Sequence, residues 1–328
     1  MPLNLDKNIG LTKVQMLVDG LSQAISQGIF QQGEALPSVN QISLKYNLSR
    51  DTVFKAYKEL KQQGLVEATR SKGYFVIGNI KKVLLLLDIY SPFKNILYQN
   101  MASNLPDDFQ VDLVFHFYNQ RLYENVIFDS IGRYNHYVIM NINNRKLDNS
   151  LKKIPRDKLL LLDLGDFEKE GLSFISQDFG ESVYQNLDKS LSHLKKYRKM
   201  IMYYPEGAVH PEITVQYFTK FCVNNNIPHE IARGKKDLIP VPGTAWFIIH
   251  QEDLVRIVKH CKEKKLVIGK DIGLLAYNDM PIYEIIEDGI SVISADFALM
   301  GQKAAEFIST KKSINETVIS KLILRGSL

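Results

Sequence analysis

A short segment from Asn47 to Leu60 carries hydroxyl and basic side chains close together. Its candidates for binding chemistry are Ser49, Arg50, Thr52 and Lys55. The planar guanidinium of arginine presents paired donors that match guanine or phosphate, so Arg50 is the strongest candidate for base recognition. Lys58 and Lys61 suit phosphates or solvent better than base edges. The competing interpretation is a half-buried surface helix with a solvated charged face.

A second basic group follows at Arg70–Gly73, between two short strand-like runs. Arg70 and Lys72 lie beside Ser71, and Gly73 permits a tight turn. Basic side chains at the tip of a hairpin suit phosphates or a minor groove. The two groups together indicate a surface for nucleic acid.

Polar side chains recur where apolar runs end in the rest of the chain. They are Asn141, Asn143, Asp163, Asp166, His250, Gln251, Asn278 and Asp279. Ligands of open α/β folds bind beyond the carboxyl ends of strands. Amide, carboxylate and imidazole groups with aromatic neighbours suit the hydroxyls and apolar faces of a sugar. Any single residue could instead cap a loop, so the recurrence is what predicts a site for a polyhydroxylated ligand.

The basic residues must be positioned by helices and a hairpin near the N-terminus. The pattern predicts helices over Leu11–Ile29, after Ser38 and over Arg50–Gln63, then two strands around the turn at Arg70–Gly73. Ser38 with Gln41 makes a capping-box pattern, and Ser49 is a good N-cap. This order is typical of a winged helix-turn-helix, in which the second helix of the pair enters the major groove.

The strand-end residues must be positioned by sheets further along the chain. After a short basic link, NIKKV, nine apolar strand-like runs alternate with helical stretches. They are KVLLLLDI, QVDLVFHF, HYVIMNI, KLLLLDL, LSFISQDF, KMIMYYP, AWFIIHQ, DIGLLAYND and ISVISADF. Such runs indicate parallel sheets covered on both faces. Nine are more than one doubly wound sheet needs, so two α/β lobes with a cleft between them are expected.

The excess positive charge lies in the first quarter of the 328 residues. Residues 1–82 hold 11 Lys and Arg against 6 Asp and Glu, a net charge of +5; the totals of 41 and 36 then leave 30 of each. This asymmetry favours a nucleic-acid-binding end, although an RNA-binding or membrane-surface end would carry the same charge. Two cysteines without metal spacing, no run long enough to span a membrane and no leader-like start predict a cytoplasmic protein without a metal site.

Three motifs in the first part resemble the GntR-type winged helix of bacterial transcription regulators. They are GEALPSVNQIS, LSRDTVFKAYKELKQQGLVEA and SKGYFV, within residues 9–78. The resemblance implies DNA contacts by Ser38, Ser49, Arg50, Thr52, Lys72 and Gly73, to which the local composition adds Lys55 and Arg70. Val39 and Asn40 stand where the family often has an acidic residue and an arginine.

The run IGKDIGLLAYNDMPIYEIIEDGISVISADFALMGQKAAEFI resembles the LacI-type, periplasmic-binding-protein-like effector domain, over residues 245–328. By resemblance Asn278 and Phe297 would line the effector cleft, and His250 would replace a polar ligand residue. The arginine that the family commonly carries on the helix after the sixth strand has no clear match here, and His210 and Glu212 lie nearest to its place in the sequence. The expected effector-binding set is Phe93, Asn141, Asp166, His210, Glu212, His250, Asn278 and Phe297.

Together these features predict a winged helix-turn-helix over residues 1–79 joined to a periplasmic-binding-protein-like body of two doubly wound parallel-sheet lobes over 80–328. The combination resembles the arabinose-repressor kind of regulator. The expected function is non-enzymatic: a cofactor-free repressor that binds double-stranded operator DNA as a homodimer and responds to a monosaccharide such as arabinose or fucose.

Three alternatives remain open at the level of sequence. The effector could be a small molecule other than a sugar. A pyridoxal-phosphate enzyme fused to a DNA-binding head would need a longer body, and the chain has no phosphate-cradling glycine loop, metalloprotease motif or nucleophile elbow. A transport-type sugar-binding protein would need a signal peptide and no basic head.

Overall fold

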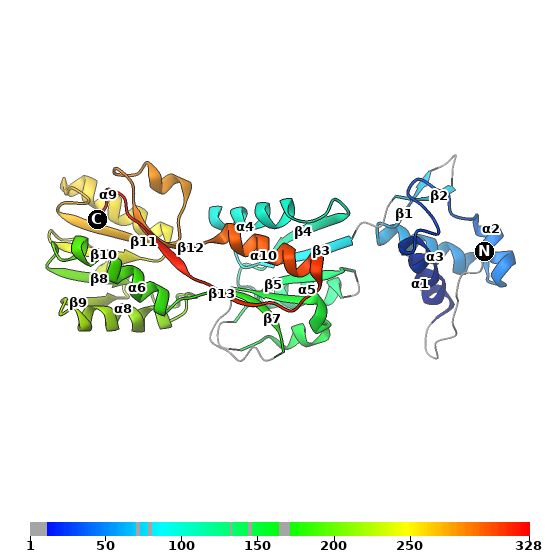
Figure 1. The fold of residues 1–328 in the computed structure, drawn as a ribbon, viewed down its shortest axis with the longest axis horizontal. Coiled ribbons are helices and arrows are strands. Elements are labelled where there is room, and N and C mark those ends of the chain that lie inside the picture. Colours follow the sequence, from blue (N-terminus) through cyan, green and yellow to red (C-terminus); the bar gives the residue numbers. More distant parts are fainter. Residues whose placement is uncertain (1–11, 70–72, 78–80, 132, 144–145, 164–170) are drawn as a thin grey trace. The chain divides into compact units, whose positions relative to one another are not determined.

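The computed structural model describes residues 12–69, 73–77, 81–131, 133–143, 146–163 and 171–328 (Figure 1). The chain divides into two compact units. The first comprises residues up to 83 with the segments 106–112 and 132–135, and the remainder forms the second. Below, the three helices and the hairpin up to residue 76 are called the head, and the two sheets with their helices, from residue 81 onward, are called the body. Among the described residues, no helix is long and apolar enough to cross a membrane.

The head consists of three helices followed by a two-stranded antiparallel hairpin. Its elements are α1 (Lys13–Ser26), α2 (Val39–Tyr46), α3 (Arg50–Gln62), β1 (Val66–Thr69) and β2 (Gly73–Val76). This is the predicted order, although the first helix is shorter than Leu11–Ile29. The turn residues 70–72 lie outside the described part of the chain.

Local hydrogen bonds determine where the two central helices of the head begin. The Ser38 hydroxyl accepts a hydrogen bond from the Gln41 amide at 3.2 Å, and the Gln41 side chain accepts one from the Ser38 amide at 2.7 Å, so the predicted capping box is confirmed. Ser49 caps α3 by accepting from the Thr52 amide at 3.1 Å. Between the helices Asn47 adopts φ = 51°, a left-handed conformation that asparagine tolerates.

One face of α3 forms the centre of the head's core. Val53, Ala56, Tyr57 and Leu60 are fully buried. They belong to one hydrophobic cluster with residues of α1 and of both hairpin strands. The Tyr57 hydroxyl also donates to the Pro37 carbonyl at 2.5 Å. The opposite face of α3 is exposed to solvent.

The first lobe of the body is built on a six-stranded sheet in the order β13-β7-β6-β5-β3-β4. The strands are β3 (Lys81–Leu87), β4 (Phe109–Phe115), β5 (His136–Met140), β6 (Leu159–Leu162), β7 (Ser173–Gln177) and β13 (Asn315–Val318). From β5 to β13 the neighbouring strands are parallel. The helices of this lobe are α4 (Pro92–Ser103), α5 (Gln120–Ser130) and α10 (Phe297–Thr310), and short 3-10 turns cover Asn149–Lys153 and Arg156–Lys158.

The second lobe has a six-stranded sheet in the order β14-β12-β11-β10-β8-β9. Its strands are β8 (Lys199–Tyr203), β9 (His229–Ala232), β10 (Thr244–Ile248), β11 (Ile272–Tyr277), β12 (Ser291–Ala295) and β14 (Ser320–Ile323). All pair in parallel except β14, which is antiparallel to β12. The helices are α6 (Glu181–Lys189), α7 (Leu191–Leu194), α8 (Ile213–Asn224) and α9 (Gln251–Lys264).

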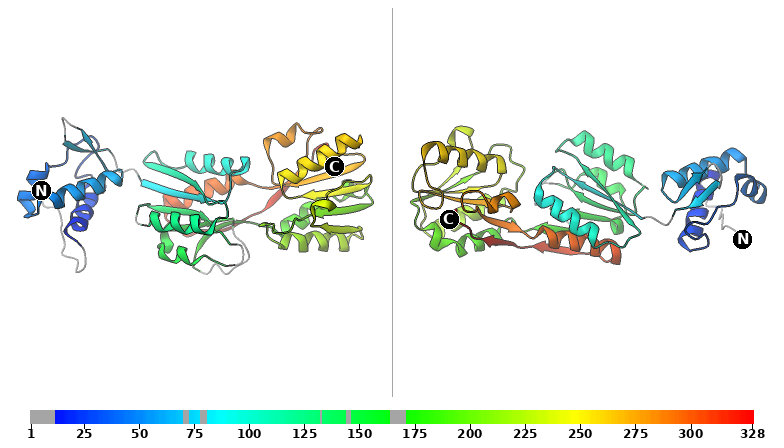
Figure 2. Two further views of the ribbon diagram at one scale, coloured as in Figure 1. Left: turned by 180° about the vertical axis from the view of Figure 1, so that it is seen from behind. Right: turned by 90° about the horizontal axis from the view of Figure 1, so that it is seen from above.

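Within the described chain, the polypeptide passes between the two sheets three times. It leaves the first sheet after β7, returns through α10 after β12, and passes from β13 in the first sheet to β14 in the second. Figure 2 shows these last segments, in orange and red, extending from one sheet to the other. Gly301 lets α10 pack closely on α4, because a Cβ there would lie 2.3 Å from the Leu97 carbonyl oxygen.

The two-lobed α/β architecture agrees with the prediction, and all nine strand-like runs are strands. Three further strands, β9, β13 and β14, were not predicted, because their sequences HEIA, NETV and SKLI are short and half exposed at sheet edges. Interpreting Lys81 as part of a basic link was wrong, since it belongs to β3, as does Lys82, which the run KVLLLLDI already included.

Candidate functional site

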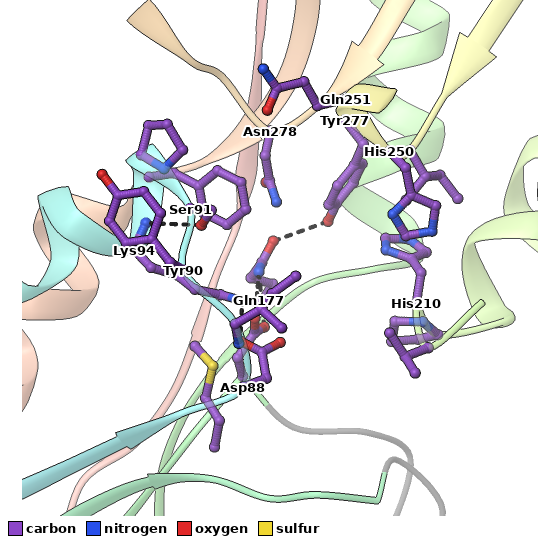
Figure 3. A pocket seen from close by; sticks show the side chains of 18 of the residues that line it. Asp88, Tyr90, Ser91, Lys94, Gln177, His210, His250, Gln251, Tyr277 and Asn278 are labelled. Carbon is purple, nitrogen blue, oxygen red and sulfur yellow. Dashed lines mark hydrogen bonds and ion pairs between the residues drawn. The ribbon is translucent and has the colours of Figure 1, made fainter. Parts of the chain in front are cut away.

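A pocket of about 570 Å³ lies in the body where strand ends of both sheets meet (Figure 3). The first lobe contributes the ends of β3, β5, β6 and β7 and the start of α4. The second lobe contributes the ends of β10 and β11 and the segment before α8. Polar groups and aromatic rings therefore face one space from both lobes, as expected for strand ends of α/β sheets.

A buried ion pair lies at the first-lobe side of the pocket. Asp88, directly after β3, pairs with the ammonium of Lys94, which is 5% exposed. The Asp88 carboxylate also accepts from the Tyr118 hydroxyl at 2.5 Å and the Ile89 amide at 2.6 Å. Because a buried charge needs such partners, the Lys94 ammonium is engaged within the protein.

A hydrogen-bonded chain links the two lobes at the base of the pocket. Gln177, the last residue of β7, donates its side-chain amide to both carboxylate oxygens of Asp163 at 2.8 and 2.9 Å. Its oxygen accepts from the Tyr277 hydroxyl at 3.1 Å, marked in Figure 3. Burial raises the pKa of Asp163 to about 6, a shift that Lys94 opposes and Asp88 reinforces.

The imidazole of His210 is held in one tautomer. The Thr214 hydroxyl donates its hydrogen to the Phe179 carbonyl at 2.8 Å, so it can only accept from His210 Nε2, which lies 2.8 Å away. Nε2 therefore carries the proton and Nδ1 is an acceptor. Burial, with a smaller contribution from His250, lowers the pKa of His210 to about 3, so the ring is neutral at pH 7.

Asn278 has a buried side-chain oxygen without a partner among the described residues. It follows β11, is 9% exposed and adopts φ = 62°. Its backbone amide donates to the Ile293 carbonyl at 2.8 Å, which fixes the residue on the sheet. An unpaired buried oxygen costs free energy, and the residue lines the pocket, so a bound donor would satisfy it.

Asn141 follows β5 in the first lobe as Asn278 follows β11 in the second, but its side-chain amide is fully hydrogen-bonded. Its nitrogen donates to the carbonyls of Asn143 and Lys146, and its oxygen accepts from the Asp148 amide at 3.1 Å and the Tyr123 hydroxyl at 3.4 Å. The side chain lines the pocket and is 7% exposed. Because its hydrogen-bonding capacity is used within the protein, Asn141 holds the loop after β5.

The exposed face of α3 in the head carries the second candidate surface. Arg50 is exposed at the first turn, and Lys55 forms an exposed ion pair with Asp51 at 2.7 Å. The Ser49 and Thr52 hydroxyls lie 2.8 Å apart. The structure thus presents a basic helix start whose hydroxyls are ordered by the cap.

The family model described as "Bacterial regulatory proteins, gntR family" matches residues 13–76. These residues form a GntR-type helix-turn-helix domain. The domain is 31% identical over 70 residues to the HTH-type transcriptional repressor YtrA of Bacillus subtilis (strain 168), a match that covers 21% of this chain and 54% of that protein. The chain thus spans about half of this curated relative and smaller shares of others, such as 14% of the regulator YjiR of Escherichia coli (strain K12).

The body, which lies outside the match to the GntR-family model, is similar in fold to solved structures of transcription regulators. The trehalose repressor from Escherichia coli has a TM-score of 0.63 at 13% identity, covering 74% of this chain and 100% of that one. A LacI family transcriptional regulator from Lactobacillus casei, with bound sucrose, has a TM-score of 0.61 at 14% identity, covering 76% and 100%. At these identities the similarity establishes a shared two-lobed fold.

The structure brings together five of the residues expected to bind the effector. Phe93, Asn141, His210, His250 and Asn278 all line the pocket.

The other three expected effector residues lie elsewhere. Glu212 is exposed, pairs with Arg233 at 3.2 Å and does not line the pocket. Phe297 is 4% exposed and packs its ring 4.6 Å from that of Phe93, behind the pocket lining. Asp166 lies outside the described residues.

The residues expected to contact DNA are also placed in part. Ser38, Ser49, Arg50 and Thr52 lie at the starts of α2 and α3, Lys55 follows in the second turn of α3, and Gly73 opens β2 with φ = 72°. Arg70 and Lys72 lie outside the described residues.

Sequence reasoning left out several residues of the pocket. They are Asp88, Lys94, Gln177 and Tyr277. Asp88 follows the apolar strand β3 and Gln177 is the last residue of β7, so both could have been found by the same signal as Asn278. Lys94 carries no such signal, because its role depends on a partner from another element.

Proposed function

We propose that the protein is a DNA-binding transcriptional repressor whose affinity for its operator is controlled by a small sugar bound in the body. The observation that carries the proposal is the joining, in one chain, of a GntR-type helix-turn-helix and a LacI-type body with an unpartnered buried Asn278 oxygen in its pocket. YtrA, which the head resembles, is named a repressor, and a protein with a similar body has sucrose bound.

The head supplies the DNA-binding part of the proposal. In a winged helix-turn-helix the second helix of the pair enters the major groove, and here that helix is α3. Its exposed start carries Arg50, whose fork matches guanine or phosphate. Two heads of a homodimer would recognise two symmetric half-sites.

The hydrogen-bonding capacity left in the pocket supports a ligand rich in donors. Lys94, Gln177 and Tyr277 donate to protein acceptors. The oxygen of Asn278 and Nδ1 of His210 remain as acceptors without a described partner. Sugar hydroxyls can donate to both, and neighbouring rings such as Phe179 can cover an apolar sugar face.

The charges that line the pocket favour a sugar without a phosphate. Asp88, Asp163 and Glu252 outnumber Lys94, and His210 is neutral. No described arginine lines the pocket. A phosphate would meet like charges without an available cation, whereas a neutral sugar would not. The proposed effector is therefore an unphosphorylated sugar, with arabinose and fucose as the first candidates.

Sugar binding would act on DNA through the movement of the two lobes. A sugar that contacts His210 and Asn278 in the second lobe and Asp88 or Asp163 in the first would stabilise the closed arrangement. Closure would change the separation of two heads in a homodimer and release the operator. A typical coupling of this kind is about 1–3 kcal/mol.

The experiment begins with selection of a duplex from a random pool by the full chain. Retention of that duplex is then measured with arabinose, fucose, glucose, sucrose and glucose 6-phosphate. We expect one neutral sugar to raise the melting temperature and release the duplex, and glucose 6-phosphate to do neither. Failure to enrich any duplex would contradict the DNA-binding part. Release by glucose 6-phosphate alone would contradict the unphosphorylated effector.

A further inference from the structure

One large apolar side chain lies on the exposed face of α3. Phe54 is 53% exposed, and it is not part of the head's hydrophobic cluster. The core residues Val53 and Tyr57 point to the other side of the helix. Exposing a phenyl ring to water leaves apolar surface that a binding partner can cover.

Phe54 lies between two basic residues on the same face of α3. It lies four residues after Arg50 and four residues before Lys58, so the three side chains form one row along the helix. Both flanking residues are basic and exposed. The row therefore presents charge, an aromatic ring and charge, which suits a polyanion with an apolar group at the middle position.

The major groove of DNA offers one apolar group at base edges, the C5 methyl of thymine. We infer that Phe54 is a specificity-determining residue that recognises a thymine methyl in each operator half-site, while Arg50 and Lys58 bind the neighbouring base or phosphates. This inference rests on the proposed DNA-binding function. It adds a contact that depends on a single methyl group.

The alternative is that Phe54 is an ordinary exposed apolar residue, since isolated ones are common on protein surfaces. The head contains a matched example, because Leu44 in α2 is 86% exposed. Leu44 is not on the helix expected to enter the groove. It therefore serves as a control for the general effect of removing an exposed apolar side chain.

The test uses the duplex selected by the full chain. Each thymine is replaced in turn by uracil, which removes the methyl and keeps the base pair. Burial of one methyl group is worth about a fourfold change in affinity. We expect uracil at one position of each half-site to weaken binding by about that factor, and by about 10- to 20-fold when both half-sites are changed.

The variants identify the residue responsible. Phe54→Ala should bind the thymine and uracil duplexes equally, Phe54→Leu should retain part of the difference, and Leu44→Ala should retain all of it. Circular dichroism checks that each variant is folded. The inference is overturned if the thymine-to-uracil ratio is the same in Phe54→Ala and the unmodified protein, or if no uracil substitution weakens binding. A pool that yields no enriched duplex would instead show that the proposed function has failed.

Discussion

Asn278 and Asn141 form a natural pair for testing how the pocket works. Both follow a strand, both line the pocket, and their exposed fractions are 9% and 7%. The oxygen of Asn278 has no described partner, whereas the amide of Asn141 takes part in four hydrogen bonds. Replacing each with alanine should therefore have opposite consequences for stability and for sugar binding.

The expected effect of Asn278→Ala on the free protein is small. Removing a buried unpaired polar group recovers about 1–3 kcal/mol of the free energy of unfolding. Alanine at φ = 62° costs about 1–2 kcal/mol relative to a residue that tolerates this conformation. The two contributions nearly cancel. Sugar binding should weaken by about 1–3 kcal/mol, which is roughly a 5- to 150-fold rise in Kd.

Asn141→Ala should instead lower the stability of the free protein and leave its affinity for sugar nearly unchanged. Four hydrogen bonds at about 0.5–1.5 kcal/mol each predict a loss of roughly 2–6 kcal/mol in the free energy of unfolding. In a domain of this size that lowers the melting temperature by roughly 4–24 °C. The sugar affinity of the folded fraction should change little, because this amide is already engaged.

Scanning calorimetry and titration calorimetry with the sugar found in the panel measure the two quantities. The reasoning is refuted if Asn278→Ala lowers the melting temperature as much as Asn141→Ala and binds sugar with unchanged affinity. In that case the Asn278 oxygen is satisfied within the protein and the effector binds elsewhere.

Three other substitutions test separate parts of the molecule. Arg50→Ala should weaken operator binding by about 1–3 kcal/mol at an unchanged melting temperature, and an unchanged electrophoretic shift would remove Arg50 from the interface. Tyr277→Phe leaves the Gln177 oxygen without its donor, so stability should fall by about 1–3 kcal/mol; equal urea midpoints for the two proteins would argue against the interlobe chain. Asp163 has a pKa of about 6, above its ordinary value of 3.8, so its charged form destabilises the fold as pH rises from about 4 to 7. The melting temperature of Asp163→Asn minus that of the unmodified protein should therefore increase over this pH range. A difference that stays constant with pH would contradict the raised pKa of Asp163.

The sequence predicted the features whose causes are local. Ser38 and Gln41 are three residues apart, and their reciprocal hydrogen bonds need only that spacing. Most of the nine predicted strands are buried, continuous apolar runs, which are typical of parallel sheets covered on both faces. Asn278 was identified because it follows such a run.

Features that depend on distant partners were missed. β13 pairs with β7 across about 140 residues of chain, and nothing in NETV signals this. Lys94 is buried only because Asp88 lies opposite it. Glu212 and Phe297 do not line the pocket, because Glu212 pairs with Arg233 and Phe297 packs against Phe93 where α10 contacts α4.

The late return of the chain through β13 and β14 determines which part of the protein can complete its fold first during synthesis. The head's elements are complete once residue 76 has been synthesised, whereas both sheets of the body wait for residues 315–323. At about 5–20 residues per second the intervening 240 or so residues take roughly 10–50 s. A chain stopped by a nonsense codon in this interval keeps the head and lacks at least β13 and β14, an edge strand of each sheet. Under the proposed function, such a fragment in a cell that also makes the full protein would occupy operators without responding to sugar, so nonsense alleles in the last third of the gene should be partly dominant.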